Sequence, residues 1–308
     1  MSERTPSRTV AQPVSPTLQS EGKSKMQPPN FGLDAGKSQD STRAIKPGLP
    51  SDQSSVRYGN DRSDPIAVQG AGDSNRIAPS DVSQGMLGDC FFLASLAAVA
   101  KFYPNLLAGN ISGPDGDGQY SVRFYRKNFF GTFEEVNIRV RPNFPEIGTS
   151  GQAAYAKEGD SNEMWVMLYE KAYAQLLGSY GTLNQGGVAE NALEALTGRE
   201  ASTTSTRSGF FGTDTMSANE IRDTIRPILQ NGRPVVADTH PERDFNNLPQ
   251  ADRDFAGTKQ IVGSHSYSVL SCSDTHVRLR NPWGGSSAEI VISWAQFRTF
   301  YPRFHSID

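Results

Sequence analysis

Residues 82–100 constrain the fold of this chain more than any other stretch. Gly85 and Gly88 form a flexible, polar approach to Cys90, and residues 91–100 are almost entirely apolar, with no Gly or Pro. A block that is apolar on nearly every side predicts a short buried helix. Cys90 would lie in its first turn, where unpaired N–H groups and the helix dipole favour a thiolate. This position suits a nucleophile, although a lone Cys beside an apolar helix is also a common core residue.

Composition excludes several classes of protein. The chain has 308 residues and a net charge of −3, which leaves room for one or two domains and argues against a nucleic-acid partner. Two cysteines cannot build a disulfide framework, and no CxxC or HExxH metal motif occurs. There is no N-terminal signal core, and the longest apolar block is too short to span a bilayer. We expect a soluble monomer with no membrane partner, either cytoplasmic or exported without a cleaved signal peptide.

The sequence divides into a tail and two halves. Residues 1–62 are rich in Ser, Pro, Gln, Lys and Asp, which predicts a disordered tail. Residues 63–200 are expected to form a mostly helical lobe that carries Cys90. Its expected elements, besides the helix from Cys90, are a hairpin of residues 119–125 and 133–140 and helices over residues 162–177 and 188–196.

Residues 201–308 change character and predict a β-rich lobe. Ser217 and Glu220 form a capping box that opens a helix. Residues 201–216 and 240–263 are expected to be connections, and strands are expected over residues 234–237, 266–272, 276–280 and 289–292. The fold class is therefore α+β with two lobes, and a cleft between lobes is where sites are usually built.

A nucleophilic Cys90 needs a base, and the chain has histidines at positions 240, 265, 276 and 305. His265 lies between small residues at the start of a strand, which leaves room beside its ring. Asn281 ends the next strand because Pro282 follows it. A Cys/His/Asn set performs acyl transfer: the thiolate attacks a carbonyl, the imidazolium protonates the leaving amine, and the Asn carboxamide orients the ring.

Strand geometry restricts this pairing. His265 and Asn281 share a face only if an odd number of residues separates the paired strands. We therefore predict a three-residue connection over residues 273–275, or another odd loop. Gln84, six residues before Cys90, could swing its amide back beside the Cys90 N–H and complete an oxyanion hole worth about 2.7–4 kcal/mol per donor.

Three segments together resemble a known family. Residues 84–94 (QGMLGDCFFLA), 264–269 (SHSYSV) and 278–284 (RLRNPWG) are similar to the signature segments of the calpain cysteine protease core. The resemblance covers residues 75–308 in collinear order and implies a papain-like fold. It matches Cys90 to the nucleophile, His265 to the base, Asn281 to the orienting residue and Gln84 to the oxyanion donor. It also matches Trp283 to an indole that shields the His–Asn hydrogen bond from water.

The resemblance also raises the question of calcium, which binds the core of animal calpains at two sites. Asp81 and Glu170 match acidic ligands of the first site, and calcium prefers several oxygen ligands. The long insertion that supplies the second site has no counterpart after residues 281–283. We therefore expect no required cofactor, with calcium possible at one site. We also expect a stand-alone core without calpain accessory domains.

These observations lead to one function and two alternatives. The chain is expected to be a cysteine endopeptidase that cuts protein and peptide substrates through a thioester. Alternatively, it is a catalytically silent binding protein on the same fold, or an acyltransferase that passes the acyl group to an amine. Cys272 is expected to be a core residue of its strand.

Overall fold

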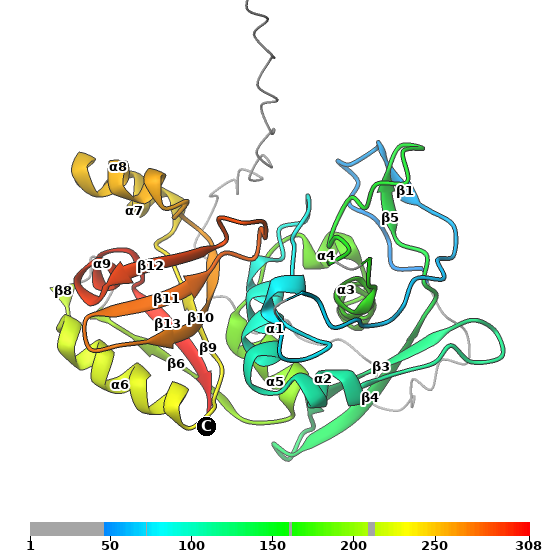
Figure 1. Ribbon diagram of the computed structural model, residues 1–308, viewed down its shortest axis with the longest axis horizontal. Coiled ribbons are helices and arrows are strands. Elements are labelled where there is room, and N and C mark those ends of the chain that lie inside the picture. The colour runs from blue at the N-terminus through cyan, green and yellow to red at the C-terminus, as the bar shows by residue number, and fades with distance from the viewer. Residues whose placement is uncertain (1–45, 72, 160–161, 209–212) are drawn as a thin grey trace, which may run out of the picture.

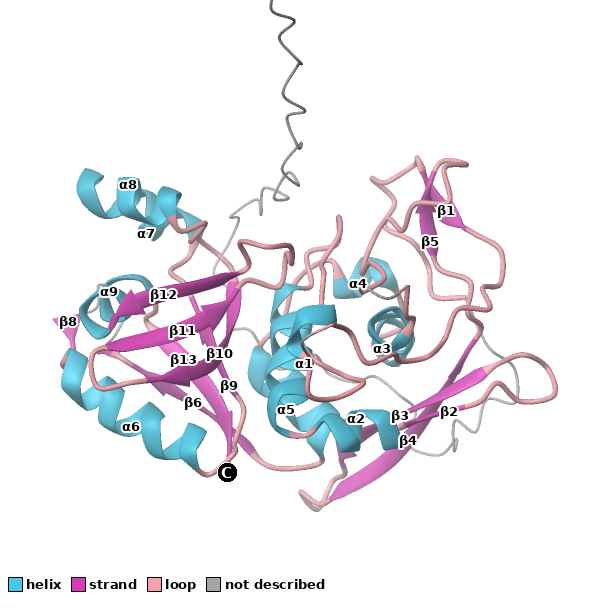
Figure 2. Cartoon of the chain, viewed as in Figure 1, coloured by secondary structure: helices cyan, strands magenta, loops and turns pink. Residues whose placement is uncertain are grey.

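The computed structural model describes residues 46–71, 73–159, 162–208 and 213–308 (Figure 1). Helices and antiparallel sheets are combined, which confirms the expected α+β class. Figure 2 shows a strand-rich part, which holds the largest sheet, beside a part in which helices pack around α1. Two hydrophobic clusters fill these parts, one dominated by residues 56–201 and the other formed by residues 221–304.

Helix α1 (Cys90–Phe102) is the centre of the first part. Every residue from Phe91 to Ala100 is buried, so the helix is enclosed on all sides, as its apolar sequence predicts. A short 3₁₀ helix, η1 (Pro79–Asp81), precedes it. The surrounding helices are α2 (Pro104–Gly109), α3 (Trp165–Leu176), α4 (Tyr180–Leu183) and α5 (Ala189–Thr197).

Short sheets complete this part. The predicted hairpin forms between β3 (Tyr120–Lys127) and β4 (Phe133–Val140), and β2 (Ile111–Ser112) joins its edge. On β3, Tyr120, Val122 and Phe124 are buried and alternate with more exposed residues, which fits a strand with one covered face. The remaining pair of this part is β1 (Val56–Tyr58) with β5 (Pro145–Ile147). A further pair, β7 (Arg207–Ser208) with β8 (Thr213–Asp214), belongs to the strand-rich part (Figure 1).

The second part is built on a six-stranded antiparallel sheet of order β12-β11-β10-β9-β13-β6. Its strands are β6 (Ala201–Ser205), β9 (Val235–Asp238), β10 (Ser266–Cys272), β11 (His276–Arg280), β12 (Glu289–Ser293) and β13 (Arg303–Ile307). The strands predicted between residues 234 and 292 are confirmed. β6 falls in a stretch expected to be a loop, and β13 was not expected.

The two faces of this sheet have different partners. Val235 and Ala237 belong to the second hydrophobic cluster, whereas Val236 between them belongs to the first. Helices α6 (Ala218–Gln230) and α9 (Trp294–Phe300) pack on the sheet, and α1 and α5 contact its central strands and β6. The central strands are therefore buried on both faces. The expected connection over residues 240–263 is partly helical, with α7 (Glu242–Asn246) and α8 (Gln250–Thr258).

The β10–β11 hairpin reaches the predicted geometry by an unpredicted route. The strand bounds leave residues 273–275 as the connection, as expected. However, Cys272 pairs with Val277, which leaves an even number of residues between them. A β-bulge between Val269 and Ser271 shifts the register, so that Ser268 pairs with Arg280 and the separation becomes odd. The bulge thus places residues 265 and 281 on one face.

The chain contacts the folded part before residue 63, within the segment that was expected to be a disordered tail. Residues 1–45 lie outside the described residues, but residues 46–62 have defined positions and correct the expected boundary. Val56–Tyr58 forms β1, and Tyr58 donates its hydroxyl proton to the carbonyl of Pro47 at 2.7 Å. In the part of the chain that the structure covers, no helix is both long and apolar enough to cross a membrane.

Arg280 ties the two parts together. Its guanidinium is buried and donates to the carbonyls of Ser80 and Val82, each at 2.9 Å, just before the Cys90 loop. The Gln84 N–H also donates to the carbonyl of Pro282 at 2.8 Å. Residues 80–84, which lead into the Cys90 approach, are therefore fixed to the end of β11 and to Pro282 after it.

We predict that Arg280→Met lowers the free energy of unfolding by about 2 kcal/mol, because two buried carbonyls lose charged donors. Arg278→Met, on the same strand, is the matched control. Its ion pair with Glu289 is solvent-exposed, so the loss is under about 1 kcal/mol. Denaturant unfolding of both variants measures the difference, and equal losses would contradict the assigned role of Arg280.

Candidate active site

Cys90 is the first residue of α1, as predicted, and is half-buried. The chain reaches it through a tight approach, in which Gly85 lies against the backbone of Ala154 and Tyr155. A Cβ at Gly85 would lie 2.1 Å from the Tyr155 carbonyl oxygen, so only glycine fits. The Cys90 thiol contacts the backbone and hydroxyl of Ser266, the residue after His265. The cysteine and the candidate base are therefore neighbours across the two parts.

His265 and Asn281 are joined by a hydrogen bond of 2.9 Å between Nε2 and Oδ1. The orientation of Asn281 is fixed, because Oδ1 accepts the Trp283 N–H at 3.0 Å while Nδ2 donates to the Gln260 carbonyl at 3.3 Å. Nε2 of His265 must then carry a proton. In the neutral ring Nδ1 is left as the acceptor, which is the tautomer that a base needs.

The surroundings of His265 hold its ring in place. Thr239 accepts the His265 N–H at 3.0 Å and donates its hydroxyl proton to the His265 carbonyl at 3.1 Å. The Trp283 ring lies 4.9 Å from the imidazole, and the Tyr267 ring meets it edge-on at 5.0 Å. His265 and Asn281 are both buried. The Trp283 indole thus lies where the resemblance puts a shield over the His–Asn pair.

The protonation state of the pair differs from the expectation for a helix N-terminus. Burial raises the pKa of the Cys90 thiol to about 12, and the negative charges of Asp238 and Asp89 add to this rise. Burial also lowers the pKa of His265 to about 4, against the opposing effect of Asn281. Both shifts favour the neutral thiol and the neutral imidazole over the expected thiolate, because burial opposes the effect of the helix dipole. Within the described residues, no hydrogen bond joins the thiol to the imidazole.

Gln84 is buried close to Cys90, but its amide is already engaged. Nε2 donates to the Leu87 carbonyl at 2.7 Å and to Asp89 Oδ1 at 3.1 Å. Both amide protons are thus used, and among the residues that the structure describes the Gln84 Oε1 has no hydrogen-bond partner. An oxyanion role for Gln84 requires its side chain to turn from this position.

A comparison with known proteins identifies the family. Residues 61–298 match the family model of the calpain family cysteine proteases. This chain is a calpain-family protein. The chain is 33% identical over 224 residues to a calpain-type cysteine protease, DEK1, of Arabidopsis thaliana, and 26% identical over 231 residues to calpain-5 of Mus musculus. These matches cover 69% and 68% of the chain, respectively. They cover 9% of the Arabidopsis protein and 34% of the mouse protein, so the chain spans a minor part of either relative.

The family match confirms the expected calpain protease fold. The two expected calcium ligands, Asp81 and Glu170, each have a different carboxyl partner in the structure. Asp81 accepts the Ala78 N–H at 2.7 Å and the Trp165 Nε1–H at 3.1 Å, and its carboxylate neighbour is Glu163. Glu170 accepts the Ala156 N–H at 2.8 Å, and its carboxyl group shares a hydrogen bond with Asp89.

The calpain core thus holds two buried acidic pairs, Asp81–Glu163 and Asp89–Glu170. Burial raises the pKa of Glu163 and of Asp89 to about 7, and it raises the pKa of Asp81 and Glu170 as well. Two carboxyl groups in contact need a shared proton or a cation between them. No pattern in the sequence indicated a role for Glu163, because it falls inside the helix predicted over residues 162–177 and belongs to no motif; in the structure it lies two residues before α3. No cluster of three His, Cys, Asp or Glu side chains suited to a metal occurs among the residues described here.

We predict that Cys90 alkylation has no plateau near neutral pH. The pKa of Cys90 is raised and that of His265 is lowered, so both groups are neutral between about pH 4 and pH 12. The thiolate fraction then rises about tenfold per pH unit. Iodoacetamide kinetics on a Cys272→Ala background, from pH 6 to pH 9, measure this slope. A plateau across this range would show a preformed ion pair instead.

Proposed function

We propose that this chain is a cysteine endopeptidase that hydrolyses peptide bonds in protein substrates with a Cys90–His265–Asn281 triad. The observation that supports it best is the His265–Asn281 hydrogen bond beside the Cys90 helix, because it leaves His265 Nδ1 free to accept a proton. Membership of the calpain family supports the cysteine protease class.

The proposed reaction begins with proton transfer from the Cys90 thiol to His265 Nδ1. Because Cys90 and His265 are both neutral at rest in this account, the transfer is a step of the reaction itself. The thiolate attacks the substrate carbonyl, and the imidazolium protonates the leaving amine, which yields a thioester. Water, deprotonated by His265, then releases the acyl group and restores the thiol. Asn281 keeps the ring oriented throughout.

The oxyanion of the tetrahedral intermediate would be bound by the Cys90 N–H and by Gln84 Nε2. Cys90 lies in the first turn of α1, so its N–H has no partner within the helix. Gln84 would exchange the Leu87 carbonyl and Asp89 carboxyl for the oxyanion. Catalytic hydrogen bonds are often absent before substrate binds, so this movement belongs to substrate binding in our account.

We predict that Cys90→Ala lowers the cleavage of a denatured protein substrate by at least about 10³-fold. Cys272→Ala is the matched control. It removes the other thiol, which lies at the far end of β10 from His265, and activity is retained. Folding of both variants is checked by thermal unfolding.

The outcomes of the same assay separate the alternatives. Unchanged cleavage by Cys90→Ala would contradict the proposed function. Binding of the substrate without cleavage by the wild type would favour a silent binding protein. Product masses in the presence of an added amine would reveal an acyltransferase, because the acyl group would then appear on the amine.

Calcium, if it binds this chain, is assigned to Asp81 and Glu163 rather than to Asp81 and Glu170. The two carboxylates are buried and in contact, which fits a hard cation, and backbone carbonyls and water would supply the other ligands. The ion would neutralise their charges and fix η1 to the residues that precede α3. The chemical steps above require no metal.

We therefore predict that calcium raises the melting temperature of the wild type and of Glu170→Gln, but not of Glu163→Gln. The physical reason is that ligand binding to the folded state alone stabilises it. Thermal unfolding with calcium or with a chelator measures this effect. Loss of the calcium response in Glu170→Gln with retention in Glu163→Gln would contradict the reassignment.

A further inference from the structure

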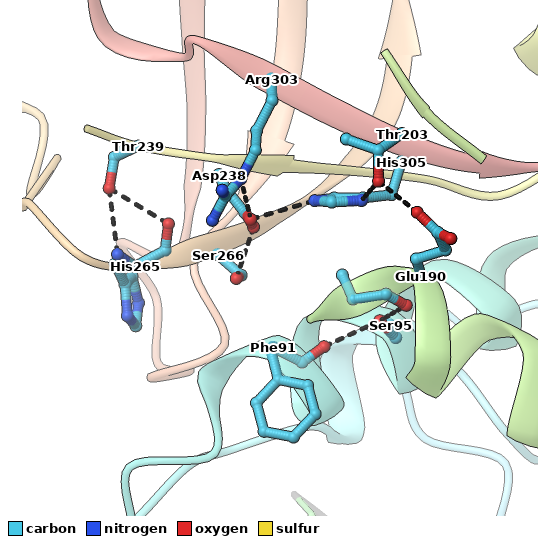
Figure 3. Close-up of polar contacts among 11 residues, drawn as sticks. Phe91, Ser95, Glu190, Thr203, Asp238, Thr239, His265, Ser266, Arg303 and His305 are labelled. Carbon is cyan, nitrogen blue, oxygen red and sulfur yellow. Dashed lines mark hydrogen bonds and ion pairs between the residues drawn. The ribbon is translucent and has the colours of Figure 1, made fainter. Parts of the chain in front are cut away.

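A row of buried polar side chains lies on the sheet face that α1 and α5 cover. Asp238 ends β9, Ser266 begins β10, and His305 is in the middle of β13 (Figure 3). Each is nearly or fully buried, with His305 at 0% exposure and Asp238 at 5%. Neither the sequence patterns nor the proposed triad accounts for a carboxylate at this depth, so its hydrogen bonds need an explanation.

The Asp238 carboxylate is fully engaged. Oδ1 accepts the Ser266 hydroxyl proton at 2.7 Å. Oδ2 accepts from Arg303 Nε at 2.9 Å and from His305 Nε2 at 3.0 Å. These partners hold the pKa of Asp238 down to about 2 in spite of its burial, so the group carries a negative charge at neutral pH. Asp238 thus holds a fixed negative charge against Ser266, the residue that follows His265.

The hydrogen-bond chain continues to the helical part of the molecule. His305 Nδ1 lies 2.8 Å from Thr203 Oγ1, and Thr203 donates its only hydroxyl proton to Glu190 on α5. Thr203 therefore links His305 on β13 to Glu190 on α5. His305 is thus held between Asp238 and Thr203, as the contacts in Figure 3 show.

Ser266 connects this network to the nucleophile. Its backbone and hydroxyl both contact the Cys90 thiol. A serine hydroxyl has one proton, and that of Ser266 is directed to Asp238 Oδ1. The backbone and hydroxyl contacts of Ser266 both lower the pKa of the Cys90 thiol and partly offset the effect of its burial.

We propose that Asp238 is a positioning residue for the Cys90–His265 pair. Its carboxylate, held against Ser266 next to both groups, favours the Cys90 thiol at rest and stabilises His265 once it is protonated. The inference rests on the proposed function for its catalytic meaning, but its effect on Cys90 ionisation can be measured without turnover.

The charges around the pair give the sign of the effect. Cys90 faces Asp238 and Asp89, and both negative charges raise the pKa of the thiol, in addition to the larger effect of burial. His265 faces Asn281 and Asp238, and each opposes the lowering of the His265 pKa by burial. Asp238 itself faces the Arg303 guanidinium and His305, and both lower the pKa of its carboxyl group. Removing the Asp238 charge therefore lowers the pKa of both members of the pair.

The test uses the pH dependence of Cys90 alkylation by iodoacetamide in a Cys272→Ala background. Asp238→Asn removes the charge and retains the shape of the side chain. The line in a plot of the logarithm of the alkylation rate against pH then moves to lower pH by about one unit, so that alkylation at pH 7 is roughly tenfold faster. Arg303→Gln removes a cation from Asp238 and moves the line the other way, by about threefold in rate, because half of its side chain is exposed and screened.

Asp274→Asn is the control, since Asp274 is an exposed aspartate in the same part of the molecule and its line should not move. If Asp238→Asn does not fold, Arg303→Gln still tests the effect of the Asp238 charge, because Arg303 is partly exposed and its substitution disturbs the core less. The proposal would be overturned if the pH dependence of alkylation were unchanged in both Asp238→Asn and Arg303→Gln, or if it moved in the same direction in both variants. A merely structural role would change the melting temperature without moving the pH dependence.

The pH profile of kcat/KM for peptide cleavage separates this inference from the proposed function. We expect both limbs of the profile to move to lower pH in Asp238→Asn. An active protease with unmoved limbs would contradict the role of Asp238 alone. An inactive wild type whose alkylation lines still shift as stated would contradict the protease function and leave the electrostatic role of Asp238 supported.

Discussion

The packing of α1 against β10 is the contact on which the rest of the site depends. Cys90 opens α1 and His265 immediately precedes β10, so the separation of nucleophile and base is the separation of these two elements. Ser268 donates its hydroxyl proton to the Ala94 carbonyl at 2.8 Å, in the middle of the buried helix. Small side chains at this contact allow the close approach, and burial of α1 on all sides prevents it from shifting alone.

That same burial sets the electrostatics of the site. A helix N-terminus stabilises an anion by about 0.3–1 kcal/mol, whereas removing a charge from water costs more. The raised pKa of Cys90 and the lowered pKa of His265 follow from the second effect. The site at rest is therefore a neutral pair beside a fixed carboxylate, Asp238, and its ionisation is coupled to proton transfer within the site.

Local patterns in the sequence predicted the parts of the fold that local chemistry controls. The apolar run after Cys90, the alternation in the β3–β4 hairpin and the stop at Asn281-Pro282 were sufficient to identify α1, the hairpin and the His265–Asn281 pair. The strand parity was also correct, but a bulge at Val269–Ser271 supplies it, and no sequence pattern marks that bulge.

Contacts between distant residues could not be predicted in the same way. Asp81 meets Glu163 instead of Glu170 because the path of the chain before α3, and not helical spacing, decides the partner. The Asp238–Ser266–His305 cluster needs three strands, one of which, β13, lacks a distinctive pattern. The pKa of Cys90 depends on how completely these elements exclude water.

The central claim is that Cys90 forms a covalent intermediate with the substrate. The direct measurement is acid quenching of a reaction with a peptide ester, followed by mass analysis of the intact protein and its fragments. Our account predicts a transient mass increase equal to the acyl group, located on Cys90 and absent in Cys90→Ala. Turnover of the ester with no acyl group on Cys90, or with the acyl group on another residue, would contradict it.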